Sequence, residues 1–148
     1  MARHALRTAE PAPAKQPPLA ILLVEDEASD RVLAKAAFDT AGLACEIQTL
    51  QDGREVLPYL QRQGKYSDTC MPDVMFLDLS LPAKDGFEVL ADLAEQPTRF
   101  GHLPIVILTG DTHCAFLKHS CDLTIAAYVT KPCTAEKISA ALADIQRQ

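Results

Sequence analysis

The chain has 148 residues, 48% hydrophobic and 23% charged, which is enough apolar material for one core and too little for two ordinary domains. A net charge of −6, an aromatic content of 5% and the absence of Trp argue against a broad nucleic-acid surface of cations and stacking rings. No apolar run approaches the roughly 20 residues that cross a bilayer, and no secretory signal opens the chain, so we expect a soluble, cytoplasmic protein without a membrane segment.

The first 18 residues have a composition that resists helix formation and buries little surface. Four prolines lie there among alanines and a few basic residues: Pro11, Pro13, Pro17 and Pro18. We interpret residues 1–18 as a flexible tail. Arg3, His4 and Arg7 could contact an acidic partner, but a plain disordered extension explains this composition better.

A continuous apolar run over residues 19–24 ends at Glu25 and Asp26 and predicts a strand buried on both faces. A helix should follow, with Ser29 as its N-cap and Gly42 at its end. The face expected to be buried is Leu33, Ala36, Ala37 and Ala41. A short strand is then expected over residues 44–50.

A second helix is predicted by the apolar stripe of Val56, Leu57 and Leu60, although Pro58 should bend or delay it. Residues 64–71 are polar and rich in turn formers. The next apolar run, residues 74–77, predicts a strand that again ends at an acid, Asp78.

The second half of the chain continues the alternation of helix and strand. After a turn at residues 84–86, a helical stripe is expected from Phe87, Leu90, Leu93 and Ala94. Strands are predicted over residues 103–108, ending at Thr109 and Gly110, and over 125–129, ending before Lys131, with a helix between them. The last helix has Thr134 as its expected cap and the stripe Ile138, Ala141, Leu142 and Ile145.

Five strands alternating with five helices predict the α/β class, a parallel sheet between two layers of helices. In such folds ligands gather at the carboxyl ends of the strands. Those ends carry Glu25, Asp26, Asp78, Thr109 and Lys131. We therefore expect these five side chains to meet at one edge of the sheet.

The chemistry of this set points to metal-assisted phosphoryl transfer. Asp26 and Asp78, with Glu25 beside them, would repel one another unless a small divalent cation such as Mg²⁺ is bound. Lys131 and the Thr109 hydroxyl can contact further phosphoryl oxygens. Asp78 is the better nucleophile, because it stands alone before a turn, whereas Asp26 lies in an acidic run suited to holding metal.

Four motifs in this order resemble the response-regulator receiver domains of two-component signalling. They are LLVED at 22–26, FLDLSLP at 76–82 with KDG at 84–86, ILTG at 107–110 and YVTKP at 128–132. The resemblance covers nearly all of residues 19–148, which we expect to form one receiver domain. It implies a flavodoxin-like, doubly wound sheet with strand order 2-1-3-4-5.

The resemblance also implies residue roles. Asp78 would take a phosphoryl group from a phosphohistidine of a sensor histidine kinase. Mg²⁺ would be held by Asp26, Asp78 and the backbone carbonyl of Ser80, with Glu25 acting through water or indirectly. Thr109 and Lys131 would contact the phosphoryl group, and Thr109 and Tyr128 would form the conformational switch.

Several positions depart from the family's usual residues or invite a special geometry. Glu25 is longer than the frequent Asp, Gly110 stands where Ala is common, and Cys133 replaces a frequent Phe. The Lys131–Pro132 bond is expected to be cis, as the family suggests. Ser80 and Asp111 match positions that tune dephosphorylation in relatives.

The longer stretch between Asp26 and Asp78 resembles the stand-alone regulators paired with phytochrome-type photoreceptor kinases. The partner expected from this resemblance is a sensor histidine kinase of that kind, a bacteriophytochrome-type photoreceptor. Dimerisation through the fourth and fifth helices is a further expectation. The last helix ends with the chain, so the signal should pass to a separate partner rather than to an output domain.

The resulting hypothesis is a phosphoacceptor switch that catalyses only its own phosphorylation and dephosphorylation. Two alternatives remain open. A pseudo-receiver would keep the fold and bind partners without phosphorylation, and a small phosphate-ester hydrolase would use Asp78 as its nucleophile. The hydrolase is disfavoured because a chain this short lacks room for a substrate-binding cap.

The five cysteines are odd in number and form no C-x-x-C pair, which argues against a disulfide framework and favours a reducing compartment. They are Cys45, Cys70, Cys114, Cys121 and Cys133. Two of them lie near His113 and His119, but this spacing matches no structural zinc site, so ordinary helix and loop positions are the preferred interpretation.

Overall fold

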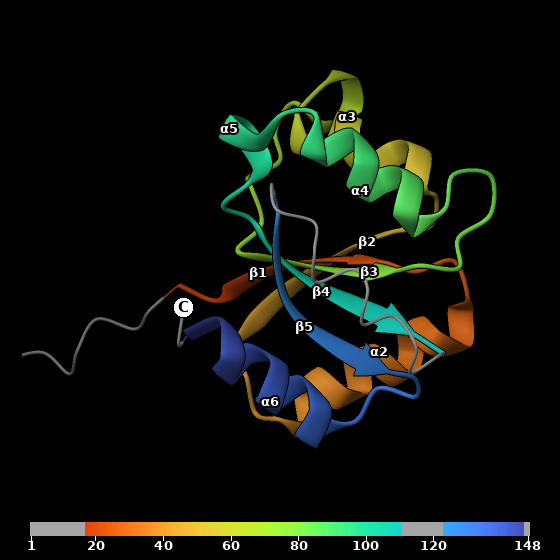
Figure 1. The fold of residues 1–148 in the computed structure, drawn as a ribbon. Coiled ribbons are helices and arrows are strands. Elements are labelled where there is room, and N and C mark those ends of the chain that lie inside the picture. The colour runs from red at the N-terminus through yellow and green to blue at the C-terminus, as the bar shows by residue number, and fades with distance from the viewer. Residues whose placement is uncertain (1–16, 111–122, 147–148) are drawn as a thin grey trace, which may run out of the picture.

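The computed structural model describes residues 17–110 and 123–146, and within them an α/β sandwich is seen (Figure 1). The strands are β1 (Leu19–Val24), β2 (Cys45–Leu50), β3 (Val74–Asp78), β4 (Pro104–Thr109) and β5 (Thr124–Thr130). The α-helices are α2 (Ala28–Thr40), α3 (Val56–Leu60), α4 (Gly86–Ala94), α5 (Pro97–Phe100) and α6 (Ala135–Gln146). Short 3₁₀ turns lie at Gly53–Glu55 and Gly64–Tyr66.

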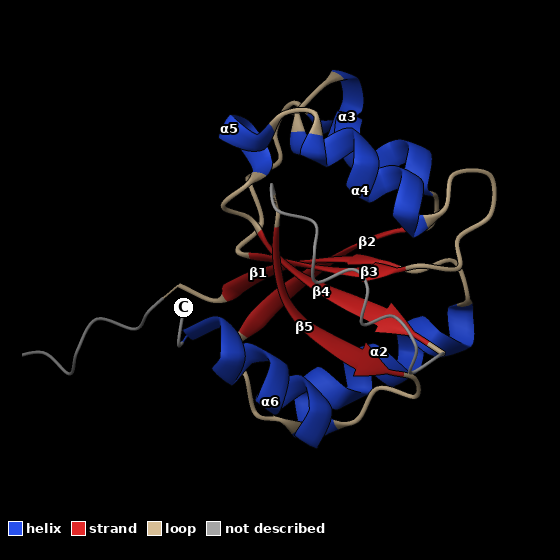
Figure 2. Ribbon diagram, in the orientation of Figure 1, coloured by secondary structure: helices blue, strands red, loops and turns tan. Residues whose placement is uncertain are grey.

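All five strands are parallel and lie in the order β2-β1-β3-β4-β5, which confirms the expected α/β class and strand order. Figure 2 shows α3, α4 and α5 on one face of the sheet and α2 and α6 on the other. Parallel neighbours need a crossover, so the chain returns to the same end of the sheet before each new strand begins. The carboxyl ends of β1, β3, β4 and β5 therefore lie along one edge.

The core has two halves, because alternate residues of each strand point to opposite faces. On the α3 and α4 side, Leu22, Met75 and Ile107 are fully buried with Leu93. On the α2 and α6 side, Leu23 and Phe76 pack with Phe38 and Ile138. The rings of Phe38 and Phe76 meet edge to face with centroids 5.1 Å apart. Strands buried on both faces explain the continuous apolar runs of the sequence.

Most predicted elements are confirmed to within about one residue at each end. The stripe of α6 is buried or half-buried as expected, and Thr134 Oγ1 accepts a hydrogen bond from the Lys137 amide (3.3 Å), as a cap should. Pro58 lies inside α3, which has only five residues and follows a 3₁₀ turn, in line with the expected delay. Gly42 follows α2 with φ of 73°.

The predicted faces of two helices were partly wrong. In α2, Leu33 is 45% exposed and Ala36 is exposed, while Ala34, Ala37 and Phe38 are buried. In α4, Phe87 is 40% exposed and Val89 is buried instead. Short stripes allow more than one helix rotation, and packing against the sheet selects between them.

The N-cap predicted for α2 was also wrong. Glu27 occupies that position and makes no side-chain cap bond, so Ser29 lies inside the helix. A cap that the pattern did not single out is present at α4. There, Asp85 accepts from the Glu88 amide (2.9 Å) and its own amide donates to the Glu88 carboxylate (3.3 Å), which forms a capping box.

The structure adds one helix, the short α5 before β4, which the pattern did not predict. The helix expected between β4 and β5 falls on residues 111–122, outside the described residues, as do Asp111, His113 and His119. Residues 1–16 of the expected tail lie outside them as well. Within the described part, no helix has the length and apolar character required to cross a membrane.

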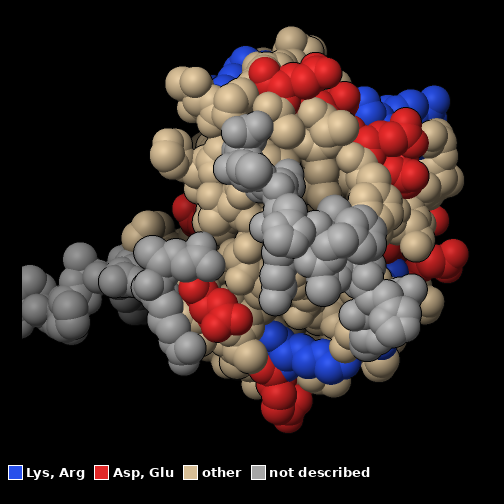
Figure 3. Space-filling view, in the orientation of Figure 1, with Lys and Arg blue, Asp and Glu red and all other residues tan. Residues whose placement is uncertain are grey.

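The surface seen in Figure 3 carries Lys and Arg atoms in small groups next to Asp and Glu. The described residues of that face therefore present a mixed charge distribution rather than one broad positive patch.

Candidate functional site

Three carboxylates meet where β1 and β3 end. Glu25 and Asp26 follow β1 directly, and Asp78 is the last residue of β3, the strand paired with β1. One oxygen from each of the three lies within 4.8 Å of the others. Glu25 and Asp78 are only 1% and 2% exposed, while Asp26 is half-buried. Hard oxygen donors this close together fit a small divalent cation such as Mg²⁺.

Lys131, in the turn after β5, supplies a positive charge to this cluster. Its Nζ lies 2.5 Å from Glu25 Oε1 and 3.0 Å from Asp78 Oδ2. A third carboxylate, Asp30 in the first turn of α2, lies 3.1 Å from the same nitrogen. One ammonium thus faces three carboxylates, with Asp26 close by, so the pocket as a whole is acidic.

Burial and the neighbouring charges change the acidity of two groups. Burial, together with the neighbouring Asp78, raises the pKa of the Glu25 carboxyl to about 7, against the opposing pull of Lys131. Burial alone would lower the pKa of Lys131, but its ion pairs with Glu25 and Asp78 outweigh this and raise it above the usual range. Lys131 therefore stays charged at neutral pH, and the pocket can accept more positive charge.

Asp78 is held at both of its carboxylate oxygens. Oδ1 accepts a hydrogen bond from the Ser80 amide (2.9 Å), and Oδ2 pairs with Lys131. Thr109 is buried at the end of β4, one residue beyond the partner of Asp78 in the β3–β4 ladder. The Lys131 amide donates to the Thr109 carbonyl (2.8 Å), so the ends of β4 and β5 are tied together here.

The comparison with protein families covers this whole region. Residues 21–143 match the model of the response regulator receiver domain, which is most of the chain. The chain belongs to the response regulator receiver domain family.

Among curated proteins, this receiver domain is 37% identical to the response regulator Rcp1 of Synechocystis sp. (strain ATCC 27184 / PCC 6803 / Kazusa) over 115 residues, which are 78% of each chain. Among solved structures, it is similar to the bacteriophytochrome response regulator AtBRR, with a TM-score of 0.77 and 34% identity over 88% of this chain and 94% of that one.

The names of two further solved structures mention a bound metal ion or phosphorylation. The Mn²⁺-bound form of Rcp1 matches with a TM-score of 0.69 and 33% identity, covering 85% of this chain and 91% of that one. The phosphorylated cyanobacterial phytochrome response regulator RcpA matches with a TM-score of 0.66 and 34% identity, covering 88% and 91%.

The structure of this receiver domain brings together the residues that the sequence placed at one edge. Glu25, Asp26 and Asp78 cluster together, Lys131 pairs with Glu25 and Asp78, and Thr109 lies at the end of the adjacent strand. The Ser80 amide is bonded to Asp78, while a metal-binding role of its carbonyl stays a prediction.

The structure also describes the other positions near the strand ends that the sequence analysis singled out. The Tyr128 ring packs against the core on the α3 and α4 side, and its hydroxyl is buried. The Lys131–Pro132 bond is cis, as expected. Cys133 is half-buried, and burial raises the pKa of its thiol, so it remains uncharged at neutral pH. Gly110 lies exposed with open space where a side chain would be.

Two residues of the site were missed by the sequence analysis, Asp30 and Arg31. Arg31 folds back from α2, and its guanidinium donates to the carbonyls of Glu25 (3.0 Å) and Asp26 (2.8 Å). It therefore holds the backbone that carries two of the three acids. The only available signal was their position, four and five residues after Asp26, which brings the first turn of a helix back over the preceding loop.

Gly86 allows the backbone of α4 to approach the segment after Asp78. Its amide donates to the Leu79 carbonyl (3.1 Å), and a Cβ at this position would lie 2.6 Å from the Asp78 carbonyl oxygen and 2.7 Å from Leu79 Cα. Both are backbone atoms, which cannot move aside cheaply. The Asp-Gly pair at the start of α4 is thus a packing requirement of the site as well as a turn.

We expect Gly86→Ala to lower the free energy of unfolding by about 2 kcal/mol, because the added methyl group overpacks this contact. Helix propensity alone predicts the opposite sign, a gain of roughly 1 kcal/mol. Urea denaturation decides between them. Gly110→Ala is the matched control, since its added Cβ meets open space, and a Gly86→Ala protein as stable as the parent would contradict the prediction.

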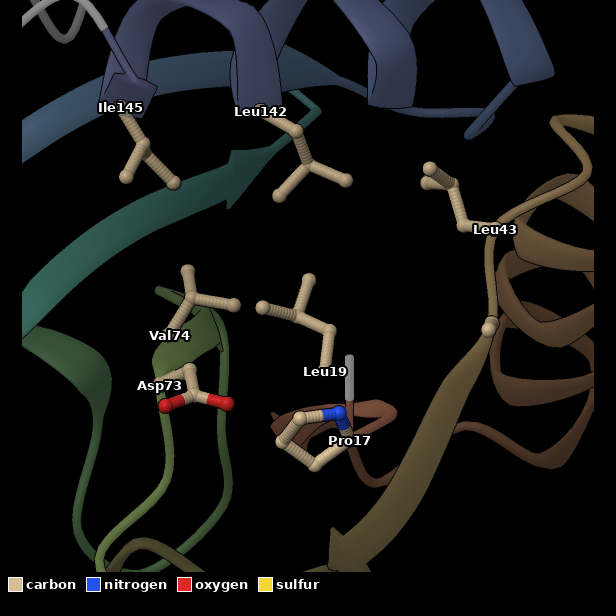
Figure 4. Close-up of a pocket in the computed structure, with 8 residues that line it drawn as sticks. Pro17, Leu19, Leu43, Asp73, Val74, Leu142 and Ile145 are labelled. Carbon is tan, nitrogen blue, oxygen red and sulfur yellow. The ribbon is translucent and has the colours of Figure 1, made fainter. Parts of the chain in front are cut away.

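A second concavity lies at the opposite end of the sheet and is apolar. Figure 4 shows Leu19 and Val74 facing Leu142 and Ile145 of α6. The pocket between them has a volume of about 330 Å³. Among the described residues that line it, the charged side chain is Asp73, which already accepts a hydrogen bond from the Ala20 amide (2.8 Å). Within this described lining, the pocket does not have the convergent polar groups of the acidic pocket.

Proposed function

We propose that the protein is a phosphorylation-driven switch, in which Asp78 accepts a phosphoryl group from a sensor histidine kinase in a Mg²⁺-dependent reaction. The observation that carries this proposal is the buried Asp78 carboxylate, paired with Lys131 and within 4.8 Å of Glu25 and Asp26. Membership of the receiver domain family supports the same function.

Asp78 would act as the nucleophile. One carboxylate oxygen forms a bond to phosphorus while the bond from phosphorus to the donor's imidazole nitrogen breaks, and the product is an acyl phosphate. The Ser80 amide and Lys131 hold the carboxylate in one orientation before attack. Lys131, already aimed at this carboxylate, can pair with a phosphoryl oxygen after transfer.

Glu25, Asp26 and Asp78 would hold the divalent cation, with the Ser80 carbonyl as a further ligand. When bound, Mg²⁺ would neutralise charge on the phosphoryl oxygens, which the acidic pocket would otherwise repel. The Mn²⁺-bound form of the similar Rcp1 supports the binding of a divalent cation. Arg31 would keep the Glu25–Asp26 backbone in place for it.

The signal would leave the pocket through Thr109 and Tyr128. Thr109 would contact the phosphoryl group, and Tyr128, on the neighbouring strand and partly buried against the core, would change its side-chain conformation in response. A phosphoryl group that favours one of two conformations shifts the population towards it. The similar RcpA, a phosphorylated phytochrome response regulator, supports phosphorylation as the input.

The partner we propose is a histidine kinase of the bacteriophytochrome type. AtBRR and RcpA, which are similar to this chain, are named as phytochrome response regulators, and Rcp1 is similar to it as well. We place the protein in the cytoplasm with that kinase. We also propose a homodimer formed through the helix expected between β4 and β5, which lies outside the described residues, and the last helix of the chain. Light scattering before and after phosphorylation tests the dimer, and a monomeric mass in both states would dismiss it.

Intact-mass spectrometry with a small phosphodonor, such as acetyl phosphate, tests the proposed function. One added phosphoryl group is expected with Mg²⁺ and none with EDTA, and hydroxylamine should remove it, as it removes acyl phosphates. No adduct under any condition would point to a binding module that works without phosphorylation. Steady consumption of the donor without a stable adduct would favour a hydrolase.

A further inference from the structure

Asp30 is a fourth carboxylate at the pocket and reaches it from a different element than the three-acid cluster. It belongs to the first turn of α2, and its Oδ2 lies 3.1 Å from Lys131 Nζ, a residue 101 positions away in the chain. An ammonium group has three N–H donors. Lys131 donates hydrogen bonds to the carboxylates of Asp30 and Asp78 and forms an ion pair with that of Glu25.

The three carboxylates differ in burial: Glu25 and Asp78 form a buried inner pair, and Asp30 is the more exposed outer partner. The side chains of Glu25 and Asp78 are 1% and 3% exposed, whereas that of Asp30 is 30% exposed. Lys131 itself is 19% exposed. The ammonium therefore stands between the buried acids and solvent, with Asp30 on the solvent side.

The inner pair are also members of the cluster suited to a divalent cation. A cation held by Asp78 and the Lys131 ammonium at 3.0 Å from the same carboxylate would repel each other strongly in a buried pocket. Glu25 and Asp78 cannot fully compensate the charge of the divalent cation and that of Lys131 at the same time. Asp30 lies outside the three-acid cluster and stays available to the ammonium.

We propose that Asp30 is a positioning residue that holds Lys131 at the mouth of the pocket while the inner carboxylates bind Mg²⁺. Without it, Lys131 competes directly with the metal for Glu25 and Asp78. With it, the ammonium keeps a partner and stays where an incoming phosphoryl group would meet it. The inference rests on the proposed function, because it takes Mg²⁺ as the ion of this pocket.

The matched control for Asp30 is Glu27. Both are acids at the amino-terminal end of α2, so removing either changes net charge and the helix end alike. Glu27 is exposed, and its side chain makes no cap hydrogen bond. A difference between Asp30→Asn and Glu27→Gln therefore isolates the contact with Lys131 from the long-range effect of one lost negative charge.

Titration calorimetry of the full chain with MgCl₂ tests the proposal. Asp30→Asn is expected to weaken Mg²⁺ binding about fivefold, the size of a partly exposed ion pair, and Glu27→Gln by less than about twofold. Phosphorylation by acetyl phosphate gives a second measurement. The Mg²⁺ concentration for half-maximal rate should rise in Asp30→Asn, while the rate at saturating Mg²⁺ stays within about twofold of the parent.

Three results would overturn the role of Asp30. If Asp30→Asn and Glu27→Gln weaken Mg²⁺ binding equally, the effect of Asp30 is a general charge effect. If Asp30→Asn leaves Mg²⁺ binding unchanged or makes it tighter, Lys131 needs no outer partner. A lower melting temperature in EDTA with unchanged Mg²⁺ affinity would mean that Asp30 only stabilises the fold. If the parent chain itself binds no Mg²⁺ at millimolar concentration, the proposed function fails first.

Discussion

In Asp78→Asn, the phosphoryl adduct is expected to disappear entirely from the intact-mass spectrum. An amide is far too weak a nucleophile to replace a carboxylate, and the other acids of the pocket are placed differently. Glu25 pairs with Lys131 from the end of β1, and Asp26 follows it in the chain. The substitution is nearly isosteric, and the new amide oxygen can still accept from the Ser80 amide, so the fold should be kept.

The same substitution should also weaken Mg²⁺ binding by about tenfold, because one of three clustered carboxylates is lost. Asp73→Asn is the matched control. Asp73 immediately precedes the same strand at its other end, where its carboxylate accepts from the Ala20 amide, an interaction that an amide oxygen can replace. An adduct of normal amount in Asp78→Asn would contradict the assignment of Asp78, whatever the control shows.

Lys131→Met is expected to lower the phosphorylation rate by about 100-fold, the usual loss when a single charged donor to a reacting centre is removed. It should also lower the free energy of unfolding in EDTA by about 3 kcal/mol, since breaking a buried ion pair leaves charge uncompensated. Glu25 and Asp78 are the buried acids that would lose their cation. Chemical denaturation and the phosphorylation time course measure the two effects separately.

Added Mg²⁺ should restore more stability to Lys131→Met than to the parent, because the metal supplies positive charge to the same carboxylates. Lys65→Met is the control. Lys65 pairs with Glu55 at 3.2 Å, but it is 73% exposed, so its loss should lower stability far less than the loss of Lys131. A Lys131→Met protein that takes up phosphoryl groups at the parent rate would remove Lys131 from the mechanism.

Most of the fold could be predicted from the sequence because two signals agreed, a continuous apolar run for each buried strand and a polar residue at its end. Apolar runs at 19–24, 74–77 and 103–108 are strands buried on both faces, and each ends at a polar residue that the structure places at the strand's carboxyl end. The helices were less certain, because a stripe of three or four apolar residues leaves the rotation of a helix open. Leu33 and Phe87 were assigned to buried faces for that reason, and packing placed both at the surface.

Part of the candidate site could likewise be predicted from the sequence, and part of it could not. The sequence by itself determined that Glu25, Asp26, Asp78, Thr109 and Lys131 stand at strand ends, because parallel strands must bring those ends to one edge. Only the tertiary structure decided that Asp30 and Arg31 join them. Their side chains come from a helix, and whether they reach the pocket depends on how α2 packs against the sheet and on the path of the turn before Lys131. Such long-range side-chain contacts leave no periodic trace in the chain.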